Sequence, residues 1–240
     1  MIYAIMMGRA GSKGMPKKNI KKINKKFICE YPLIAAKKSR FVKKIFVTTD
    51  CPIISKISKK YNAEIIKRPK KLATSSALGE DVYEHAYKLI KRIEKKIKYL
   101  VLLMANAPTI NEKIIDRGIN FLNKNLNFDS AVSVSEYNMW SPIRARKLNK
   151  KGELVPFVPF KNFMKNGIVN CDRDSQGSVL FADMSVSIVR AKCLENMKDG
   201  LLPQKWMGKK IAPIFSESGL DIDYEWQLPQ AEFWIKKFLR

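Results

Sequence analysis

Residues 2–19 read Ile-Tyr-Ala-Ile-Met-Met-Gly-Arg-Ala-Gly-Ser-Lys-Gly-Met-Pro-Lys-Lys-Asn, an apolar run that leads directly into a loop of glycines and cations. The apolar residues 2–7 predict a buried strand. In the loop, glycines at three-residue spacing allow backbone amides to approach an anion, and one Arg with three Lys can neutralise its charge. Because ligands of open α/β sheets bind beyond the carboxyl ends of the strands, residues 8–19 predict a triphosphate site. Their spacing is neither that of a P-loop nor that of a GxGxxG motif.

Further apolar runs and helical patterns alternate after this loop. Residues 99–104 are almost continuously apolar, as expected of a parallel strand that is buried on both faces. The alternation predicts an α/β fold with a doubly wound, mostly parallel sheet, and 240 residues suffice for one such domain spanning 1–240. The predicted strands are 2–7, 44–49, 64–66, 99–104, 129–135 and 184–189, and the predicted helices are 31–40, 53–61, 79–95, 111–125 and 224–239.

The rhythm of strands and helices breaks at about residues 137–182. Prolines and a glycine interrupt short apolar runs there, which indicates a β-rich excursion from the domain rather than further βα units. We find no internal repeat and no low-complexity linker, so the prediction is one domain with an excursion.

The formal net charge of +24 is the most unusual property of the composition. The lysines are spread over nearly every predicted helix, without the interleaved Arg and aromatic residues of nucleic-acid readers, so we interpret them as solvated faces. We expect no specific nucleic-acid partner, although nucleic-acid binding remains a less favoured hypothesis. A single histidine and scattered cysteines argue against a zinc site or a Ser-His-Asp triad. The cysteine usage, the apolar start and the lack of an apolar run of about 20 residues predict a cytoplasmic protein without a membrane span.

Asp221 and Asp223 stand two residues apart near the end of the chain. In an extended segment this spacing directs both carboxylates to one side, which suits Mg²⁺. Asp223 has a second interpretation, as the N-cap of the following helix. Asp50 is interpreted as a structural acid at a strand end, and His85 as a packed or surface histidine rather than a base.

Several segments resemble one known family, in the same order. Residues 8–19 resemble the N-terminal motif of the acylneuraminate cytidylyltransferases, the CMP-sialic acid synthetase family. Four further segments are similar to its motifs: residues 47–50 (Val-Thr-Thr-Asp), Arg68-Pro69 with Leu72-Ala73, residues 102–108, and Asp221-Ile222-Asp223. The resemblance covers essentially the whole chain.

The resemblance implies a Rossmann-like nucleotidyltransferase fold and a reaction. The anomeric hydroxyl of a nine-carbon α-keto sugar acid (sialic, legionaminic or pseudaminic type) would attack the α-phosphate of CTP and release pyrophosphate, with Mg²⁺ bound. It also implies a homodimer, in which the excursion contributes sugar binding and dimer contacts. Such chemistry requires neutralised phosphates and a nucleophile held in line. The loop and the late acids must therefore share one cleft.

The resemblance also assigns residues by position. The catalytic residues would be Arg9, Lys18 and Asp223, and the metal ligands Asp221 and Asp223. In the excursion, Arg173, Gln176 and Arg144 are candidates for the substrate carboxylate because the guanidinium of Arg offers it a planar fork, and surface residues on a β-rich loop are the alternative interpretation. The nucleotide-binding set is Gly8, Arg9, Ala10, Gly11, Ser12, Lys13, Asn19, Arg68 and Gly79, and the substrate-binding set is Asn106, Arg173 and Gln176.

Two positions depart from the family pattern. Met104 stands where members commonly have Gln, and Asp183-Met184 stands where they commonly have Asn-Gly. Both changes leave the phosphate chemistry intact. They leave undecided which sugar is the acceptor and, to some extent, which base the nucleotide carries. Residues 105–108 lack the acid of the related Kdo cytidylyltransferases, which favours a nonulosonic acid. A nucleotidyltransferase for another nucleotide or sugar, such as Kdo, is the alternative, and an inactive nucleotide-binding relative is a further one.

Overall fold

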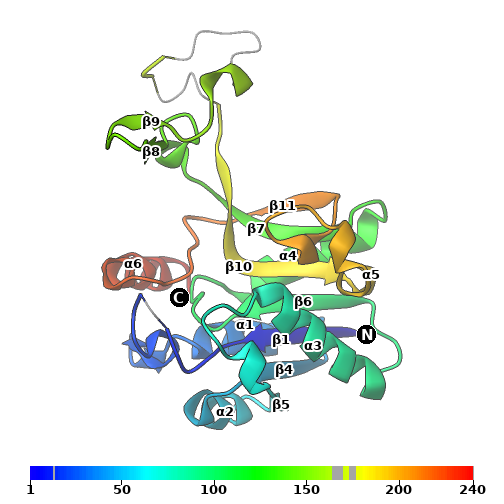
Figure 1. The fold of residues 1–240 in the computed structure, drawn as a ribbon. Coiled ribbons are helices and arrows are strands. Elements are labelled where there is room, and N and C mark those ends of the chain that lie inside the picture. Colours follow the sequence, from blue (N-terminus) through cyan, green and yellow to red (C-terminus); the bar gives the residue numbers. More distant parts are fainter. Residues whose placement is uncertain (13, 164–169, 173–176, 240) are drawn as a thin grey trace.

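A computed structural model describes residues 1–12, 14–163, 170–172 and 177–239. Within these residues a seven-stranded sheet has the order β11-β7-β10-β6-β1-β4-β5 (Figure 1). Only β10 runs antiparallel to its neighbours, and the other pairs are parallel. This confirms the predicted mostly parallel sheet. Its strands are β1 (Ile2–Met7), β4 (Lys44–Thr49), β5 (Glu64–Lys67), β6 (Tyr99–Met104), β7 (Ser130–Glu136), β10 (Leu180–Arg190) and β11 (Ile211–Phe215).

Helices cover both faces of the sheet. One apolar cluster contains buried residues of α1 (Glu30–Lys38), α2 (Pro52–Lys59), α4 (Glu112–Lys124) and α6 (Leu228–Phe238). The other contains buried residues of α3 (Gly79–Ile93) and α5 (Ala191–Glu195). Successive side chains of β1 alternate between the two clusters, because neighbouring residues of a strand point to opposite faces. The doubly wound arrangement is therefore confirmed.

Short elements complete the fold. Two hairpins stand outside the large sheet, β2 (Lys22–Ile23) with β3 (Lys26–Phe27) and β8 (Arg146–Leu148) with β9 (Leu154–Pro156). The described residues also contain 3₁₀ turns: η1 (Lys18–Ile20), η2 (Lys70–Leu72), η3 (Asn138–Trp140), η4 (Phe160–Asn162), η6 (Met197–Asp199), η7 (Lys205–Met207) and η8 (Glu225–Gln227). In this described part of the chain, no helix combines the length and the apolar character needed to cross a membrane.

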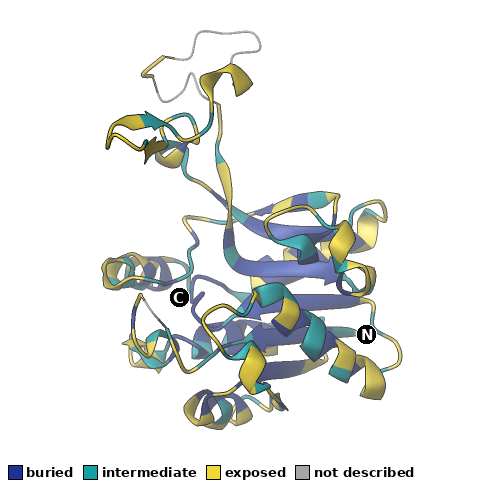
Figure 2. Cartoon of the chain, viewed as in Figure 1, coloured by how far each residue is buried: buried dark blue, intermediate teal, exposed yellow. Residues whose placement is uncertain are grey.

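The predicted excursion leaves the sheet after β7 and returns in β10. Figure 1 shows the β8–β9 hairpin standing away from the main body, and Figure 2 shows that it is largely exposed, whereas the strands of the large sheet are buried. The return strand begins at Leu180 rather than at the predicted residue 184. Its pairing with β7 shifts register between Ala182 and Ser187, so β10 continues beyond the core across an irregularity that the apolar pattern alone does not reveal.

The last predicted helix begins later than expected. Residues 225–227 form the turn η8, and α6 starts only at Leu228. The side chain of Gln227 accepts hydrogen bonds from the backbone N–H groups of Asp223 (2.7 Å) and Tyr224 (2.8 Å), which holds this junction out of the helix. Pro229 lies in the first turn of α6, where its missing N–H group costs nothing.

Candidate active site

The residues predicted from distant parts of the chain meet at the carboxyl edge of β1, β4 and β6. A cavity of about 170 Å³ opens there. It is lined by seven residues of the predicted set: Gly8, Arg9, Lys18, Asn19, Arg68, Gly79 and Asn106. Loops that follow three adjacent strands and the first turn of α3 therefore build one site, as expected at the carboxyl ends of a doubly wound sheet.

The glycine-rich loop is held between the ends of β4 and β6. Gly8 donates its N–H group to Thr48 O (3.2 Å), and Ala10 donates its N–H group to Asp50 Oδ1 (3.0 Å). A Cβ atom on Gly8 would lie only 2.7 Å from the Cβ of Ala105, so no side chain fits where the loop passes β6. Asp50 thus orders the loop through its backbone, in line with its interpretation as a structural acid.

Lys18 joins the start of the chain to its end. Its ammonium donates to the Asp223 carboxylate, and the two side chains are 16% and 50% exposed. Gly14 also contacts this segment, since a Cβ there would lie 2.8 Å from the carbonyl oxygen of Asp223. The loop and the segment of the late acids are therefore in contact, whereas a shared binding cleft stays a prediction, since neither Asp221 nor Asp223 lines the cavity. The alternative role of Asp223 as a helix N-cap is wrong, because Tyr224 and Gln227 occupy the cap positions of η8 and α6.

Asp221 lies behind this ion pair in a partly buried position. Asn106 donates its side-chain amide to Ile222 O (3.0 Å) and, at 3.4 Å, to Asp221 Oδ2. Burial raises the pKa of Asp221, the nearby charge of Asp223 raises it further, and Lys18 offsets part of the effect. The two acids therefore repel each other in the protein alone. Among the described residues no group of three or more His, Cys, Asp or Glu could hold a metal, so a cation here would share these two carboxylates with ligand oxygens.

Two arginines add positive charge to the cavity. Arg68 is only 6% exposed, and its Nη2 donates to Thr48 O at 2.7 Å. Desolvation lowers the pKa of this guanidinium and the charge of Asp50 raises it, but an arginine remains cationic at neutral pH. Arg9 donates to Thr74 O at 2.7 Å. Three cations therefore line one small cavity, Arg9 and Lys18 from the glycine-rich loop and Arg68 from the segment after β5.

Asn19 presents an unused hydrogen-bond acceptor at the cavity. Its side-chain nitrogen donates to Arg9 O (3.0 Å), which orders the loop, while its buried Oδ1 has no partner among the described residues. A buried acceptor without a donor costs about 1–3 kcal/mol. The arrangement favours a ligand that supplies an N–H or O–H group.

Some predicted residues lie elsewhere. Ala10 and Gly11 are exposed and Ser12 is half-buried on the outer part of the loop, so none of them lines the cavity. Arg144 is exposed and donates to Cys171 O (3.1 Å) within the excursion. Lys13, Arg173 and Gln176 lie outside the described residues. The contacts of these three residues therefore stay predictions.

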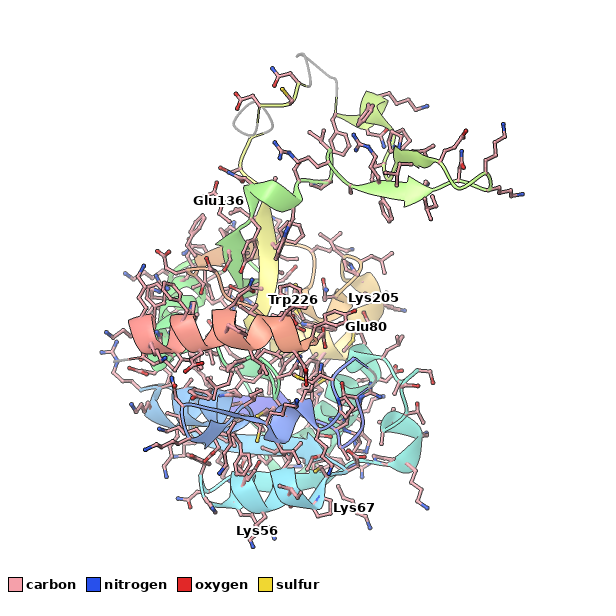
Figure 3. All side chains as sticks on the ribbon, turned by 90° about the vertical axis from the view of Figure 1, so that its left-hand side faces the viewer. Lys56, Lys67, Glu80, Glu136, Lys205 and Trp226 are labelled. Carbon is pink, nitrogen blue, oxygen red and sulfur yellow. The ribbon has the colours of Figure 1, made fainter. Side chains whose placement is uncertain are left out.

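The structure adds lining residues that the motifs did not identify. Thr74 and Ala77 come from the turn-rich segment before α3, and Val82 comes from its first turns, whereas the lining residue Leu72 belongs to the motif at residues 68–73. Glu80 lies in the first turn of that helix, and its carboxylate accepts from the N–H group of Lys205 at 3.0 Å, which fixes the helix start (Figure 3). A threonine, two serines and an alanine before a helix were the available signal (residues 74–77).

Met104 lines the cavity, so the departure from the family pattern lies inside the site. His85 does not line the cavity. Burial lowers the pKa of His85, and so do the charges of Lys71 and Arg68, so it is neutral at pH 7. Both facts agree with its interpretation as a packed histidine.

Comparisons with known proteins identify the family of the chain. The family described as cytidylyltransferase matches residues 3–151. Post-translational flagellin modification protein B of Campylobacter coli is 34% identical over 246 residues, which cover 98% of this chain and 95% of that protein. N-acylneuraminate cytidylyltransferase of Escherichia coli O18:K1:H7 is 29% identical over 169 residues, which cover 70% of this chain but 39% of that relative.

The fold has counterparts among solved structures. The CMP:2-keto-3-deoxy-manno-octonic acid synthetase complexed with CTP superimposes with a TM-score of 0.67 over 98% of both chains, at 14% identity. This likeness concerns the fold alone. The family match over more than half of the residues and the alignment with the Campylobacter coli protein over almost the whole of both chains agree, and the chain therefore belongs to the cytidylyltransferase family of nucleotidyltransferases.

Proposed function

We propose that the protein transfers CMP from CTP to a nine-carbon α-keto sugar acid of sialic, legionaminic or pseudaminic type and releases pyrophosphate. The observation that carries the proposal is the contact of Lys18 with Asp223 beside a cavity that also holds Arg9 and Arg68. The relative in Escherichia coli, named as an N-acylneuraminate cytidylyltransferase, supports the substrate class.

The cations of the cavity suit the charge changes of the reaction. Arg9, Lys18 and Arg68 neutralise the triphosphate, and Gly8 lets the backbone of the loop approach it without side-chain bulk. Lys18 exchanges part of its contact with Asp223 for phosphate oxygens as CTP binds. Asn19 Oδ1 then accepts a hydrogen bond from the nucleotide, which satisfies its buried lone pair.

Asp221 and Asp223 would hold Mg²⁺. They fit this ion, because burial and then the nearby charge of Asp223 raise the pKa of Asp221, and a cation beside both carboxylates would offset that repulsion. Bound there with phosphate oxygens, Mg²⁺ would neutralise charge on the transferring phosphoryl group and the leaving group. Asn106 keeps Asp221 in place through its side-chain amide. Lys18 and Asp223 hold each other toward the phosphates.

The acceptor sugar acid would bind beside the α-phosphate, with its anomeric hydroxyl held in line. Asn106 offers a polar contact from the end of the central strand, and Arg173 and Gln176 stay predictions for the sugar carboxylate. Met104 makes this side of the cavity less polar than a glutamine would. A nucleotidyltransferase for another nucleotide or for Kdo is therefore the second candidate function.

A homodimer is part of the proposal. The β8–β9 hairpin exposes apolar side chains, among them Leu148, Leu154 and Phe157, which a small hairpin cannot bury against itself. A second copy of the chain would cover them and could add residues to the sugar site. All four cysteines are free thiols, and CTP is an intracellular nucleotide, so we place the reaction in the cytoplasm.

The test is a pyrophosphate-release screen of the four ribonucleoside triphosphates against a panel of nonulosonic acids and Kdo, with and without Mg²⁺. We expect release only with CTP, a nonulosonic acid and Mg²⁺ together. Release with Kdo or with another nucleotide would establish the second candidate. If no pair reacts but CTP binds, the chain is an inactive nucleotide-binding relative.

A further inference from the structure

Asp183 is a buried carboxylate outside the cavity, only 5% exposed. It lies where the pairing of β10 with β7 shifts register, next to Met184, whose φ is +59°. Such a bulge turns a side chain away from its regular direction. A carboxylate removed from water is costly unless several donors surround it, so the partners of Asp183 indicate what it does.

The described partners of Asp183 are neutral donors. The hydroxyl of Ser133 and the N–H group of Ser185 (3.0 Å) donate to Oδ1, and the hydroxyl of Ser135 (2.7 Å) donates to Oδ2. Both serines lie on β7 and are almost completely buried. Their other hydrogen bonds differ. Ser133 bonds the backbone of Val186 on the neighbouring strand, whereas Ser135 bonds a segment that follows β11.

That segment, residues 216–222, carries Asp221 and has no regular secondary structure. Its backbone is held largely by side chains. Ser135 Oγ accepts from Gly219 N (2.8 Å), Tyr137 donates its hydroxyl to Gly219 O (2.9 Å), and Thr109 Oγ1 accepts from Leu220 N (2.7 Å). These hydrogen bonds replace the strand partners that the segment lacks.

Asp183 decides how Ser135 can hold this segment. The hydroxyl of Ser135 has one proton, and its distance to Asp183 Oδ2 (2.7 Å) is shorter than that to Ser216 O (3.3 Å). Because this hydroxyl proton points to Asp183 Oδ2, the lone pairs of Ser135 Oγ are free to accept the hydrogen bond from Gly219 N. The segment also packs directly on the carboxylate, since a Cβ on Gly219 would lie 2.4 Å from Asp183 Oδ2.

We propose that Asp183 is a positioning residue which, through Ser135, fixes residues 219–220 and thereby places Asp221 in the active site. Asp221 follows Leu220 directly, and Asn106 holds the next residue, Ile222, by a backbone hydrogen bond of 2.8 Å. The residues on both sides of Asp221 are therefore held by hydrogen bonds, Gly219 and Leu220 before it and Ile222 after it. Its part in the reaction rests on the proposed function, whereas its placement by Asp183 does not.

The test compares Ser135→Ala with Ser133→Ala. Each variant removes one hydroxyl that donates to Asp183 from the same buried strand, but only Ser135→Ala also removes the acceptor of Gly219 N. These variants avoid Asp183 itself, whose replacement endangers folding. The first measurement is amide hydrogen exchange of residues 216–222, and the second is the Mg²⁺ concentration that gives half-maximal pyrophosphate release.

We expect Ser135→Ala to raise the exchange rate of residues 219–220 by roughly fivefold, as the loss of one hydrogen bond predicts, and to raise the Mg²⁺ requirement with it. The maximal rate of Ser135→Ala at saturating Mg²⁺ stays near that of the wild type. Ser133→Ala raises neither the exchange rate of residues 219–220 nor the Mg²⁺ requirement in this way. Equal exchange of residues 219–220 in the two variants overturns the inference. If the wild type releases no pyrophosphate, the proposed function fails, and exchange alone still decides the positioning.

Discussion

Lys18 shows how a single side chain connects the ends of the chain. Its ammonium contacts Asp223, and the side chain lines the cavity beside Arg9. Three residues further on, Lys21 makes a second ion pair with the same late segment, to Glu225 Oε1 at 2.6 Å. This second pair is more exposed and lies outside the cavity lining. Lys18 therefore carries charge at the site, whereas Lys21 only joins two segments of the chain.

We expect Lys18→Met to lower kcat/KM by about 100-fold or more, because it removes a cation from the developing charge while keeping an apolar stem. Lys21→Met is the matched control and should stay within about threefold of the wild type, as expected for an exposed pair. Steady-state pyrophosphate release measures both. Equal effects of the two substitutions would contradict the role of Lys18.

Asp129 contributes to stability rather than to the site. Burial raises the pKa of Asp129, but hydrogen bonds from Lys192 and from the N–H groups of Lys210 and Lys209 outweigh it and lower the pKa to about 2. A carboxyl with a lowered pKa stabilises the fold above its unfolded pKa, near 4, and loses this contribution as the pH falls toward 2.

Asp129→Asn should therefore lower the free energy of unfolding at pH 7 by about 1–2 kcal/mol. The difference from the wild type should shrink between pH 4 and pH 2, when the wild-type carboxyl becomes protonated. Urea unfolding at pH 7 and pH 3 measures it, with the exposed Asp199→Asn as a neutral control. A difference that is the same at both pH values would exclude this explanation.

At the scale of elements, the β8–β9 hairpin of the excursion exposes apolar side chains that the main body does not cover. Leu148 and Leu154 lie opposite each other in the β8–β9 pair and are 68% and 72% exposed. Figure 3 shows the excursion rising from the end of β7 at Glu136. A cross-strand apolar pair that faces solvent at the tip of an extension is typical of an interaction surface.

If a second copy covers this hairpin, the wild type has twice the chain mass of 27.6 kDa in solution. The double variant Leu148→Lys/Leu154→Lys should then be monomeric, because charged side chains are costly in an interface core. Leu126→Lys is the matched control, since Leu126 is 75% exposed on the main body. Light scattering decides between the states. A monomeric wild type, or a control that dissociates equally, would refute the assignment of this surface.

At the scale of the whole molecule, the net charge of +24 attracts every anion, including CTP and nucleic acid. We expect the KM for CTP to rise several-fold between about 50 and 200 mM salt, because ions screen this attraction. Binding to duplex DNA should vanish over the same range, as counterion release predicts for non-specific contacts. Fluorescence anisotropy of a labelled duplex measures the DNA binding. Duplex affinity that persists at about 200 mM salt would favour the nucleic-acid hypothesis instead.

The sheet could be predicted from the sequence because its evidence is local. A run such as Tyr99–Met104 carries its own signal of burial on both faces, and the loop at residues 8–19 is a continuous motif at a known place in the fold. The strand order and the start of β10 at Leu180 depend on pairing between distant segments, which local patterns do not contain.

The same division holds for the site. Residue types and spacing along the chain predicted its chemistry, with cations near the start and the acids Asp221 and Asp223 near the end. Only the tertiary structure decided that Lys18 meets Asp223, that Arg68 turns into the cavity, and that Asp183 supports the segment carrying Asp221. These contacts join residues up to 205 positions apart, and they exist only because packing of the sheet brings the strand ends to one edge.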